Sequence, residues 1–422
     1  MERVKVIVIG AGSRGQGYTN IMKDSFDDAY QVVGVAEPIK DRREYVRDKH
    51  GILEENCYES WEQILDRPKF ADVAVISTMD RMHYEPAMKA LELGYNLLLE
   101  KPVSPVPAEC VEIEKKAKEM GAKVVVCHVL RYTPFFKTLK RLIKEGAVGN
   151  VMTVTHIEGV GNVHQSHSFV RGNWANSDES SPMILQKSCH DTDIIQWLVD
   201  SDCKSVQSFG GLSYFNADNA PEGAPERCMD GCPIYDECPY NAVKLYYDDK
   251  DNMWFRPAAT GKTSPTDEDV WEALRTTDYG KCVFHCNNNV VDHQVVNLLF
   301  ENGVTASFSM NAFNKGGRQI RVMGTKGELF GKAEEDFVEL YDFKTKTTRK
   351  ISCESNIDGE GIMSGHGGGD EGIVKTFLDV LSGISDAEQI SGIEISCKNH
   401  LISFAAEKSR LENKIINPED LR

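Results

Sequence analysis

The stretch from Val4 to Glu37 constrains the fold more than any other part of this 422-residue chain. The β-branched run Val4–Ile9 predicts a buried parallel strand, and a Gly-Ala-Gly-Ser-Arg-Gly turn follows it directly. Glycines at this spacing allow a tight turn, close approach of a pyrophosphate and close packing of the next helix. A second expected strand, 31–36, ends at Glu37, where a carboxylate can accept hydrogen bonds from a ribose. The unit therefore predicts a dinucleotide-binding Rossmann fold.

The expected cofactor contacts lie in this turn and at the end of the second strand. They are Gly10, Gly12, Ser13, Arg14, Gly15 and Glu37. Free N–H groups at the start of the helix should face the phosphates. A Glu37 carboxylate would repel a ribose 2′-phosphate, whereas the Arg14 guanidinium could hold one, so NAD is favoured over NADP.

Length and charge limit the remaining classes of function. The length predicts two domains, and the net charge of −17 argues against nucleic acid and membrane surfaces as partners. We find no run of about 20 apolar residues and no signal-peptide pattern, so we expect a soluble, cytoplasmic protein. The twelve cysteines are mostly scattered, which fits reduced thiols in the cytosol better than a secreted disulfide framework.

Strand and helix patterns alternate up to about residue 126 and then change. Further strands are expected at 73–76, 95–99 and 123–126, and at 152–157, 292–300, 305–310 and 318–323. The first group completes a doubly wound parallel sheet, whereas the second, with a hairpin at 301–303, predicts a largely antiparallel sheet. We therefore expect an α/β protein with a Rossmann domain over 1–130. An α+β substrate-binding and oligomerisation domain should follow over 131–422.

The second sheet needs cover on its faces. Helices such as 191–199 can supply it, and so can a second subunit. We therefore expect a homo-oligomer, either a dimer or a tetramer.

Four polar residues follow two expected strands of the parallel sheet. They are Thr78, His83, Glu100 and Lys101. Ligands of such sheets bind beyond the carboxyl ends of the strands, so these side chains should lie near the cofactor. Lys101 stands between a buried strand and Pro102, which indicates a held ammonium able to bind a substrate hydroxyl and take part in proton transfer.

The chain resembles the Gfo/Idh/MocA family of oxidoreductases, which act mostly on sugars, inositols and their derivatives. The matching motifs are the glycine turn, the loop 78–83, the run 90–94 leading to Glu100-Lys101-Pro102, Arg131-Tyr132-x-Pro134, and the segments 146–151 and 318–329. They span most of the chain apart from an insert at about 210–290. The resemblance implies that Lys101 is the catalytic lysine and His190 the histidine of the substrate domain.

Family members often carry an aspartate four residues before this histidine, and here Gln186 stands there. A neutral amide can orient His190 but cannot stabilise an imidazolium as a carboxylate does. Lys187 is close enough on an expected common helix to reach the site. We therefore expect His190 to be the principal acid/base, with Lys187 and Lys101 binding hydroxyls or sharing the proton. In the alternative, His190 caps the helix and Lys187 pairs with Asp191.

Three histidines and one aspartate outside these motifs are weaker candidates. His164 and His167 lie in a polar stretch that could contact substrate, and so could His366 in a glycine run. Asp370 after that run is expected to be the N-cap of the next helix.

The insert also contains a cluster of cysteines. Cys228, Cys232 and Cys238 are followed much later by Cys282-x-x-His285-Cys286. The segment is rich in Pro, Gly and Asp, so a metal could replace missing hydrophobic burial there. The spacing fits no standard zinc ribbon, and structural zinc, an iron–sulfur cluster and unligated thiols all remain open.

The leading functional prediction is an NAD-dependent dehydrogenase that oxidises a secondary hydroxyl of a sugar, glycoside or cyclitol, or reduces the ketone. One alternative is an NAD-dependent glycosidase that works by transient oxidation. Another is a non-catalytic sugar or nucleotide sensor.

Overall fold

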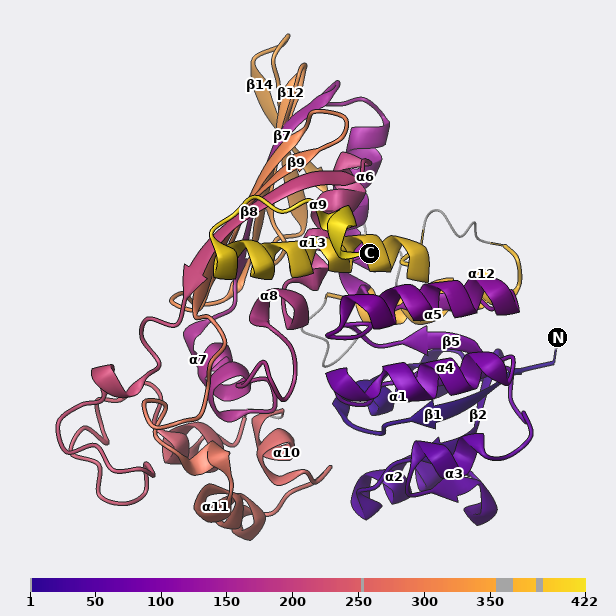
Figure 1. Ribbon diagram of the computed structural model, residues 1–422, viewed down its shortest axis with the longest axis vertical. Helices are drawn as coiled ribbons and strands as arrows, with labels where there is room; N and C mark the ends of the chain where they lie inside the picture. Colours follow the sequence, from indigo (N-terminus) through magenta and orange to yellow (C-terminus); the bar gives the residue numbers. More distant parts are fainter. Residues whose placement is uncertain (1, 252–253, 354–366, 385–389) are drawn as a thin grey trace.

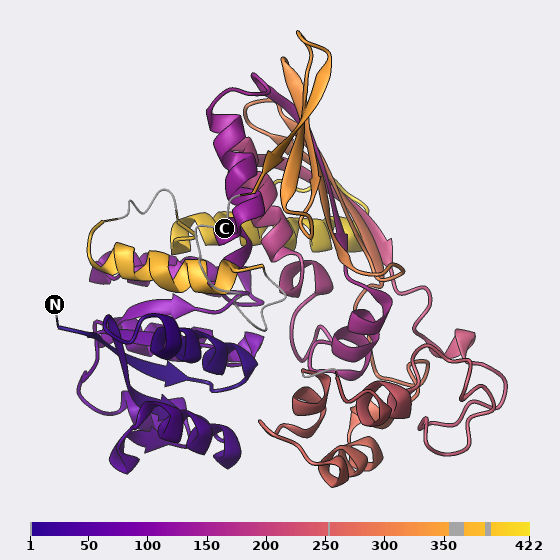
Figure 2. The ribbon, with the colours of Figure 1, turned by 180° about the vertical axis from the view of Figure 1, so that it is seen from behind.

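The computed structural model of the protein describes residues 2–251, 254–353, 367–384 and 390–422. Two sheets organise the molecule, and a third, loop-rich lobe carries the short helices α7, α10 and α11 (Figure 1). The lobe and the first sheet lie below the second sheet in both views (Figure 2). In the described part of the chain, no helix is long and apolar enough to cross a membrane.

The first sheet has six parallel strands in the order β3-β2-β1-β4-β5-β6. They are β1 (Val4–Ile9), β2 (Tyr30–Ala36), β3 (Cys57–Tyr58), β4 (Val73–Ile76), β5 (Asn96–Leu99) and β6 (Val124–Val126). The connecting helices are α1 (Ser13–Ser25), α2 (Lys40–His50), α3 (Trp61–Leu65), α4 (Tyr84–Glu92) and α5 (Pro107–Met120). The strand order reverses between β1 and β4, which creates the crevice where such sheets bind ligands. The predicted doubly wound sheet is confirmed.

The second sheet has eight strands in the order β14-β13-β12-β11-β7-β10-β9-β8. They are β7 (Val151–Gly159), β8 (Cys203–Gly211), β9 (His293–Phe300), β10 (Thr305–Asn311), β11 (Gly317–Gly324), β12 (Gly327–Lys332), β13 (Phe337–Asp342) and β14 (Thr347–Ser352). Its neighbours pair antiparallel except β7 and β10, which are parallel. The predicted largely antiparallel sheet is therefore confirmed.

One face of this second sheet is covered by helices. The remaining helices of the molecule are α6 (Pro134–Lys144), α7 (Asn162–Gln165), α8 (Met183–Gln186), α9 (Cys189–Val199), α10 (Phe255–Thr260), α11 (Asp267–Thr276), α12 (Gly369–Leu381) and α13 (Ile393–Glu412). Residues of α6 and α9 share one apolar core with Val154 of β7 and with alternate residues of β9 and β10. The alternation in β9 is strict, with every second residue buried.

The C-terminal helices return to the first sheet. Helix α12 packs on α1, and its residues Ile373, Val374 and Phe377 share a core with β1 and β2. Helix α13 contacts α5, α8, α9 and β8, so it lies between the two sheets (Figure 1). The chain thus crosses back over the expected boundary at residue 130, and that division of the sequence stays a prediction.

Candidate functional site

The glycine turn is shaped so that side chains would obstruct it at two positions. Gly10 has φ +86°, and a Cβ there would lie 2.7 Å from the backbone of Ser77. A Cβ on Gly15 would lie 2.1 Å from the carbonyl oxygen of Gly10. At Gly12, by contrast, the nearest atom to an added Cβ is the Nη1 of Arg42, at 3.8 Å. Gly10 and Gly15 are therefore packed tightly against neighbouring backbone atoms, whereas the space beside Gly12 is open. An approaching pyrophosphate requires this open space.

Helix α1 begins directly after this turn. Gly12 is its N-cap, and no side chain caps its first N–H groups. These donors, with Ser13 in the first turn, are the groups that could hold a phosphate. The residues present therefore fit a dinucleotide.

Glu37 is buried at the end of β2 and is held by two backbone donors. Its Oε2 accepts from the Ala11 N–H at 2.7 Å, and its Oε1 accepts from the Ile39 N–H at 2.9 Å. Each carboxylate oxygen can accept a second hydrogen bond, so the group remains able to bind ribose hydroxyls. Its position is thus fixed by the turn that would carry the phosphates.

Arg14 faces the end of β5. Its Nε donates to Oε1 of Glu100 at 2.8 Å, and its Nη2 contacts Tyr18 and Asp370. Burial opposes ionisation of Glu100, but the charges of Arg14 and Lys101 outweigh it and hold the pKa of Glu100 below its ordinary value. Two carboxylates therefore balance the Arg14 charge.

Asp370 belongs to this ion-pair group instead of capping α12. The N-cap of α12 is Gly368, and Asp370 lies within the first helical turn. The predicted N-cap role of Asp370 is therefore wrong, because an arginine more than 300 positions away in the sequence binds its carboxylate. His366 lies outside the described residues.

Lys101 links the two domains. Its Nζ donates to the carbonyl oxygen of Gln186 at 2.7 Å, and its backbone N–H donates to Oε2 of Glu100 at 2.9 Å. His83 is fully buried, with Nδ1 2.7 Å from the Pro102 oxygen and Nε2 3.1 Å from the Thr78 oxygen. His83 thus braces the two loops that follow β4 and β5, and it contacts the protein through both ring nitrogens.

The loop after β4 also binds the second domain. Asp80 is buried there, where its Oδ1 accepts from the Trp174 indole N–H at 3.2 Å and its Oδ2 from the Ser181 hydroxyl. Segment 174–181 of the second domain therefore contacts the loop after β4 at the carboxyl edge of the first sheet.

The segment around His190 is not one continuous helix. Helix α8 ends at Gln186 and α9 begins at Cys189, with Ser188 as its N-cap. The expectation that Lys187 and His190 lie on one common helix is therefore wrong. His190 lies in the first turn of α9, with its ring 5.8 Å from that of His128.

Lys187 pairs with Glu158 of β7 and not with Asp191. The distance from Nζ to Oε1 is 3.2 Å, and both side chains are largely buried. Burial lowers the pKa of Lys187 despite the Glu158 charge. Burial likewise raises the pKa of Glu158, although Arg318 and Lys187 oppose it. Each partner is thereby moved toward its neutral form, which is the condition for passing a proton between them.

Glu158 and Arg318 are site residues that the sequence analysis missed. The Nε of Arg318 lies 2.8 Å from Oε2 of Glu158 and 2.8 Å from Oδ1 of Asp191. Asp191 also accepts from Nε2 of His156 at 2.7 Å. One signal was present, because His156 and Glu158 are polar residues two apart on β7 and so share its buried face.

His164 and His167 both lie beside the Trp254 ring, but their other contacts differ. His164 lies in α7, where burial drives its pKa well below the ordinary value and the charge of Lys187 adds to the effect. The charges of Lys187 and Lys101 both act on its ring. His167 instead stacks on Phe255, with ring centroids 4.1 Å apart, and bonds the Tyr246 hydroxyl at 2.9 Å, so it is a packing residue.

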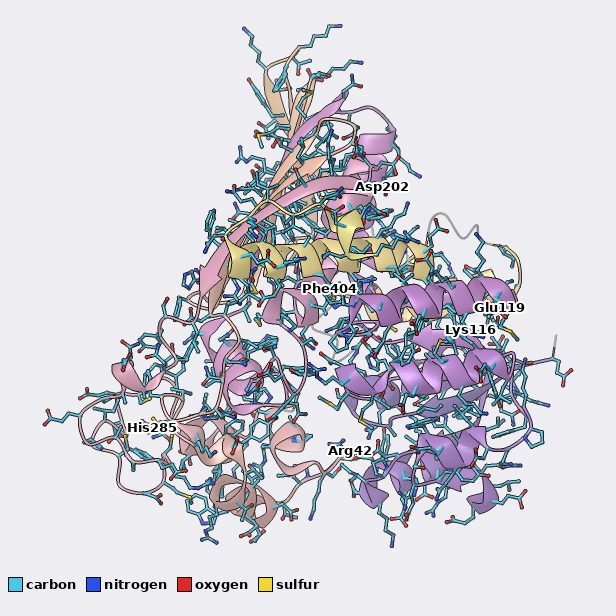
Figure 3. The ribbon with its side chains drawn as sticks, viewed as in Figure 1. Arg42, Lys116, Glu119, Asp202, His285 and Phe404 are labelled. Atoms are coloured by element: carbon cyan, nitrogen blue, oxygen red, sulfur yellow. The ribbon has the colours of Figure 1, made fainter. Side chains whose placement is uncertain are left out.

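The insert reaches back to the cofactor domain. The Nε of Arg42 in α2 donates to the Gly261 oxygen at 2.9 Å, and the Thr263 N–H donates to Oδ2 of Asp41 at 2.8 Å. Figure 3 shows Arg42 where the loop after α10 meets the first domain. Because Arg42 also adjoins Gly12, this loop closes the outer end of the glycine turn.

The insert contains five cysteines, Cys228, Cys232, Cys238, Cys282 and Cys286. Cys228, Cys232, Cys238 and Cys282 line one cavity, while His285 bonds the Ala224 oxygen through Nε2 at 3.3 Å. In the described ranges of the chain, no three His, Cys, Asp or Glu side chains converge closely enough to hold one metal ion.

Comparisons with known proteins address the whole chain. A Gfo/Idh/MocA family model, described as the NAD-binding Rossmann fold of an oxidoreductase family, matches residues 4–128. A second model, described as the C-terminal alpha/beta domain of that oxidoreductase family, matches residues 140–361. The two matches correspond to the two sheets described above.

Two related sequences and one solved structure illustrate the range of similarity. YteT of Bacillus subtilis (strain 168), an oxidoreductase by name, is 22% identical over 444 residues, covering 99% of this chain and 98% of that protein. Inositol 2-dehydrogenase/D-chiro-inositol 3-dehydrogenase of Lactiplantibacillus plantarum is 24% identical over 228 residues, covering 53% of this chain and 61% of that protein. A levoglucosan dehydrogenase, solved in complex with NADH and levoglucosan, shares the fold with a TM-score of 0.70, 16% identity and 99% coverage of both chains.

Proposed function

The chain belongs to the Gfo/Idh/MocA family of NAD-binding oxidoreductases, and we propose that it dehydrogenates a secondary hydroxyl of a sugar, glycoside or cyclitol. Reduction of the corresponding ketone would use the same groups. The observation that carries the proposal is the contact from Lys101 Nζ to the Gln186 oxygen. It brings the lysine at the end of β5 against the segment that holds Lys187 and His190, at the crevice where a nicotinamide would arrive.

NAD is the proposed cofactor in preference to NADP. Glu37 is buried and held at the end of β2, where its charge disfavours a 2′-phosphate. The Nε and Nη2 of Arg14, which could have favoured NADP, are engaged with Glu100, Tyr18 and Asp370.

Proton handling is assigned to residues of both domains. When bound, NAD supplies the hydride acceptor for the substrate carbon. We assign the hydroxyl proton to His190 as principal acid/base, with Lys101 donating a hydrogen bond to the reacting oxygen. Lys187 binds a neighbouring hydroxyl and can exchange a proton with Glu158, 3.2 Å away.

The substrate class rests on the relatives and on the polarity of the site. The named substrates of the relatives above are a cyclitol and an anhydro-sugar, both polyols with several secondary hydroxyls. The paired charges of Lys187 with Glu158 and of Arg318 with Asp191 offer both donors and acceptors to such a ligand.

Two substitutions test the assigned roles. His190→Asn and Lys101→Met should each reduce kcat by about 100-fold or more while NAD binding is retained, because each removes a group that acts on the reacting oxygen. Lys118→Met on the exposed surface of α5 is the matched control and should keep full activity. Wild-type turnover in both active-site variants, with confirmed NAD binding, would overturn the assignment.

A redox-cycling glycosidase is the second candidate function. Arg42 of α2 donates a hydrogen bond to the Gly261 oxygen of the insert. This contact closes the outer end of the glycine turn and favours retention of a cofactor between turnovers. A reaction that oxidises and then reduces its substrate needs this retention. Release of free sugar from a glycoside without net NADH would identify it.

We also propose that the protein forms a homo-oligomer through the uncovered face of the second sheet. Phe209, Val295, Leu299 and Ile157 stand on this face, each more than a third exposed. Burial of such side chains stabilises association, since each removes apolar surface from water. Light scattering should report a dimer or tetramer, and Val295→Lys with Leu299→Lys should shift it to the monomer.

A further inference from the structure

Four cysteines of the insert surround a single cavity. They are Cys228, Cys232, Cys238 and Cys282, and Arg171 lies in the same wall. An antiparallel bridge between Arg227 and Lys281 sets two of these cysteines side by side, although they are distant in the sequence. Arg171 Nη2 lies 3.6 Å from Cys228 Sγ, and Cys282 lines the same cavity. The backbone therefore brings Cys228 and Cys282 close together.

The surrounding segment has little regular structure of its own. Between β8 and residue 242 the chain forms turns and one short 3-10 helix, Ala217–Asn219. Small apolar clusters flank it, and Cys228, Cys238 and Cys282 belong to them. Segments of this kind commonly gain stability from a metal centre, which supplies the folding energy that burial does not.

Arg171 is a buried cation next to the sulfurs. Its Nε donates to the Lys281 oxygen at 2.7 Å, its Nη2 donates to the Tyr240 oxygen at 2.7 Å and approaches Cys228 Sγ at 3.6 Å. Its Nη1 is buried without a hydrogen-bond partner.

The guanidinium of Arg171 is buried beside these cysteines, with Nη2 3.6 Å from Cys228 Sγ. A buried guanidinium is costly unless a negative charge lies beside it. Thiolates bound to a metal centre supply that charge, whereas four neutral thiols do not.

A single metal ion and an iron–sulfur cluster need different spacings of their cysteine ligands. A single zinc ion draws its thiolates to within about 2.3 Å of one point. In the described residues no three candidate ligands converge in that way, whereas four cysteines line one cavity. In a cluster each thiolate binds a different iron, so the sulfurs stand farther apart.

We propose that the four cysteines lining this cavity bind a [4Fe–4S] cluster with a structural role. The four thiolates and the cluster core carry a net negative charge, which Arg171 offsets. Cys286 is outside the ligand set, because it does not line the cavity and its Sγ donates to the Cys282 oxygen at 3.3 Å. The centre fixes the insert, whose far end contacts α2 through Gly261 and Thr263.

The test is a metal and sulfide analysis of the full-length protein, produced with added iron and purified without oxygen. We expect about four iron atoms and four acid-labile sulfides per chain, with a broad visible absorbance band that bleaches on reduction. One zinc per chain, four titratable thiols without metal, or disulfides among these cysteines would each overturn the proposal. This measurement needs only the wild-type protein and no variant.

A matched pair of variants tests the ligand set. Cys238→Ser should lose most of the iron, whereas Cys286→Ser, in the same lobe but outside the cavity wall, should keep it. Retained NAD binding by Cys238→Ser shows that the first domain is folded in the variant. Full iron content in Cys238→Ser would remove that residue from the ligand set and contradict the four-cysteine site. The result is independent of the proposed dehydrogenase activity, which needs no cluster.

Discussion

Two buried histidines should make the protein lose stability in mild acid. Burial lowers the pKa of His167 and of His400 to about 3 in each case. His400 accepts from the Val103 N–H at Nε2 and lies 2.7 Å from the Ser396 oxygen through Nδ1, so a proton on Nε2 would face another donor. Both rings are therefore neutral in the folded protein.

The direction of this stability change follows from the number of protons that the folded and unfolded chains bind. Below an ordinary histidine pKa of about 6.5, the unfolded chain binds protons that the folded chain does not, so stability falls as pH decreases. Between pH 7 and pH 5 each histidine contributes a loss of about 2 kcal/mol, at about 1.4 kcal/mol per pH unit below its unfolded pKa. The two together account for about 4 kcal/mol.

Urea unfolding followed by tryptophan fluorescence at pH 7 and pH 5 measures this loss. His400→Gln should reduce the difference by about 2 kcal/mol, because the variant has no group to titrate there. His285→Gln, which alters an exposed ring, is the control and should keep the full difference. An unchanged difference in His400→Gln would refute the reasoning.

Three further variants test the cofactor turn and the charge network. Gly15→Ala should weaken NAD binding at least about tenfold by calorimetry, since its Cβ would lie 2.1 Å from a carbonyl oxygen. Gly17→Ala, with no atom within 4 Å of the added Cβ, should bind normally, and equal affinities would contradict the turn assignment. Glu37→Ser should lower the ratio of kcat/KM for NAD to that for NADP by about tenfold or more, and an unchanged ratio would argue against its ribose role. Arg318→Met should cost about 3–5 kcal/mol in urea unfolding because it leaves buried carboxylates unpaired, whereas Arg321→Met on the same strand breaks a more exposed pair and should cost about 1 kcal/mol or less.

Local patterns predicted the first sheet well. The strands at 73–76 and 4–9 match β4 and β1 at both ends, because β-branched runs bounded by glycine or polar turns encode buried parallel strands. The hairpin at Gly303 was likewise predictable, since β9 and β10 pair antiparallel around it.

Side-chain partnerships between distant segments could not be predicted in this way. Helical spacing suggested that Lys187 and Asp191 could pair, but the break between α8 and α9 turns Lys187 toward Glu158 of β7. Asp370 fitted an N-cap pattern locally, yet Arg14 binds it. Such choices depend on how the sheets and helices pack, which spacing along the chain does not encode.

The insert was the least predictable part of the fold. Its polar, glycine-rich composition gave no signal that Gly261 and Thr263 would contact α2 beside the glycine turn. Its cysteine spacing matched no standard motif, and the common cavity emerges only when the bridge between Arg227 and Lys281 forms.

The most direct test of the proposed function is to incubate the purified protein and NAD with a panel of inositols, monosaccharides, uronates and glycosides. The absorbance of NADH is measured during each incubation. We predict a rise in NADH with one class of polyol, slowed by about 100-fold or more in His190→Asn and preserved in Lys118→Met. No NADH with any member of the panel, and no ketone reduction with added NADH, would contradict a dehydrogenase. Sugar release from a glycoside without NADH would instead establish the redox-cycling alternative.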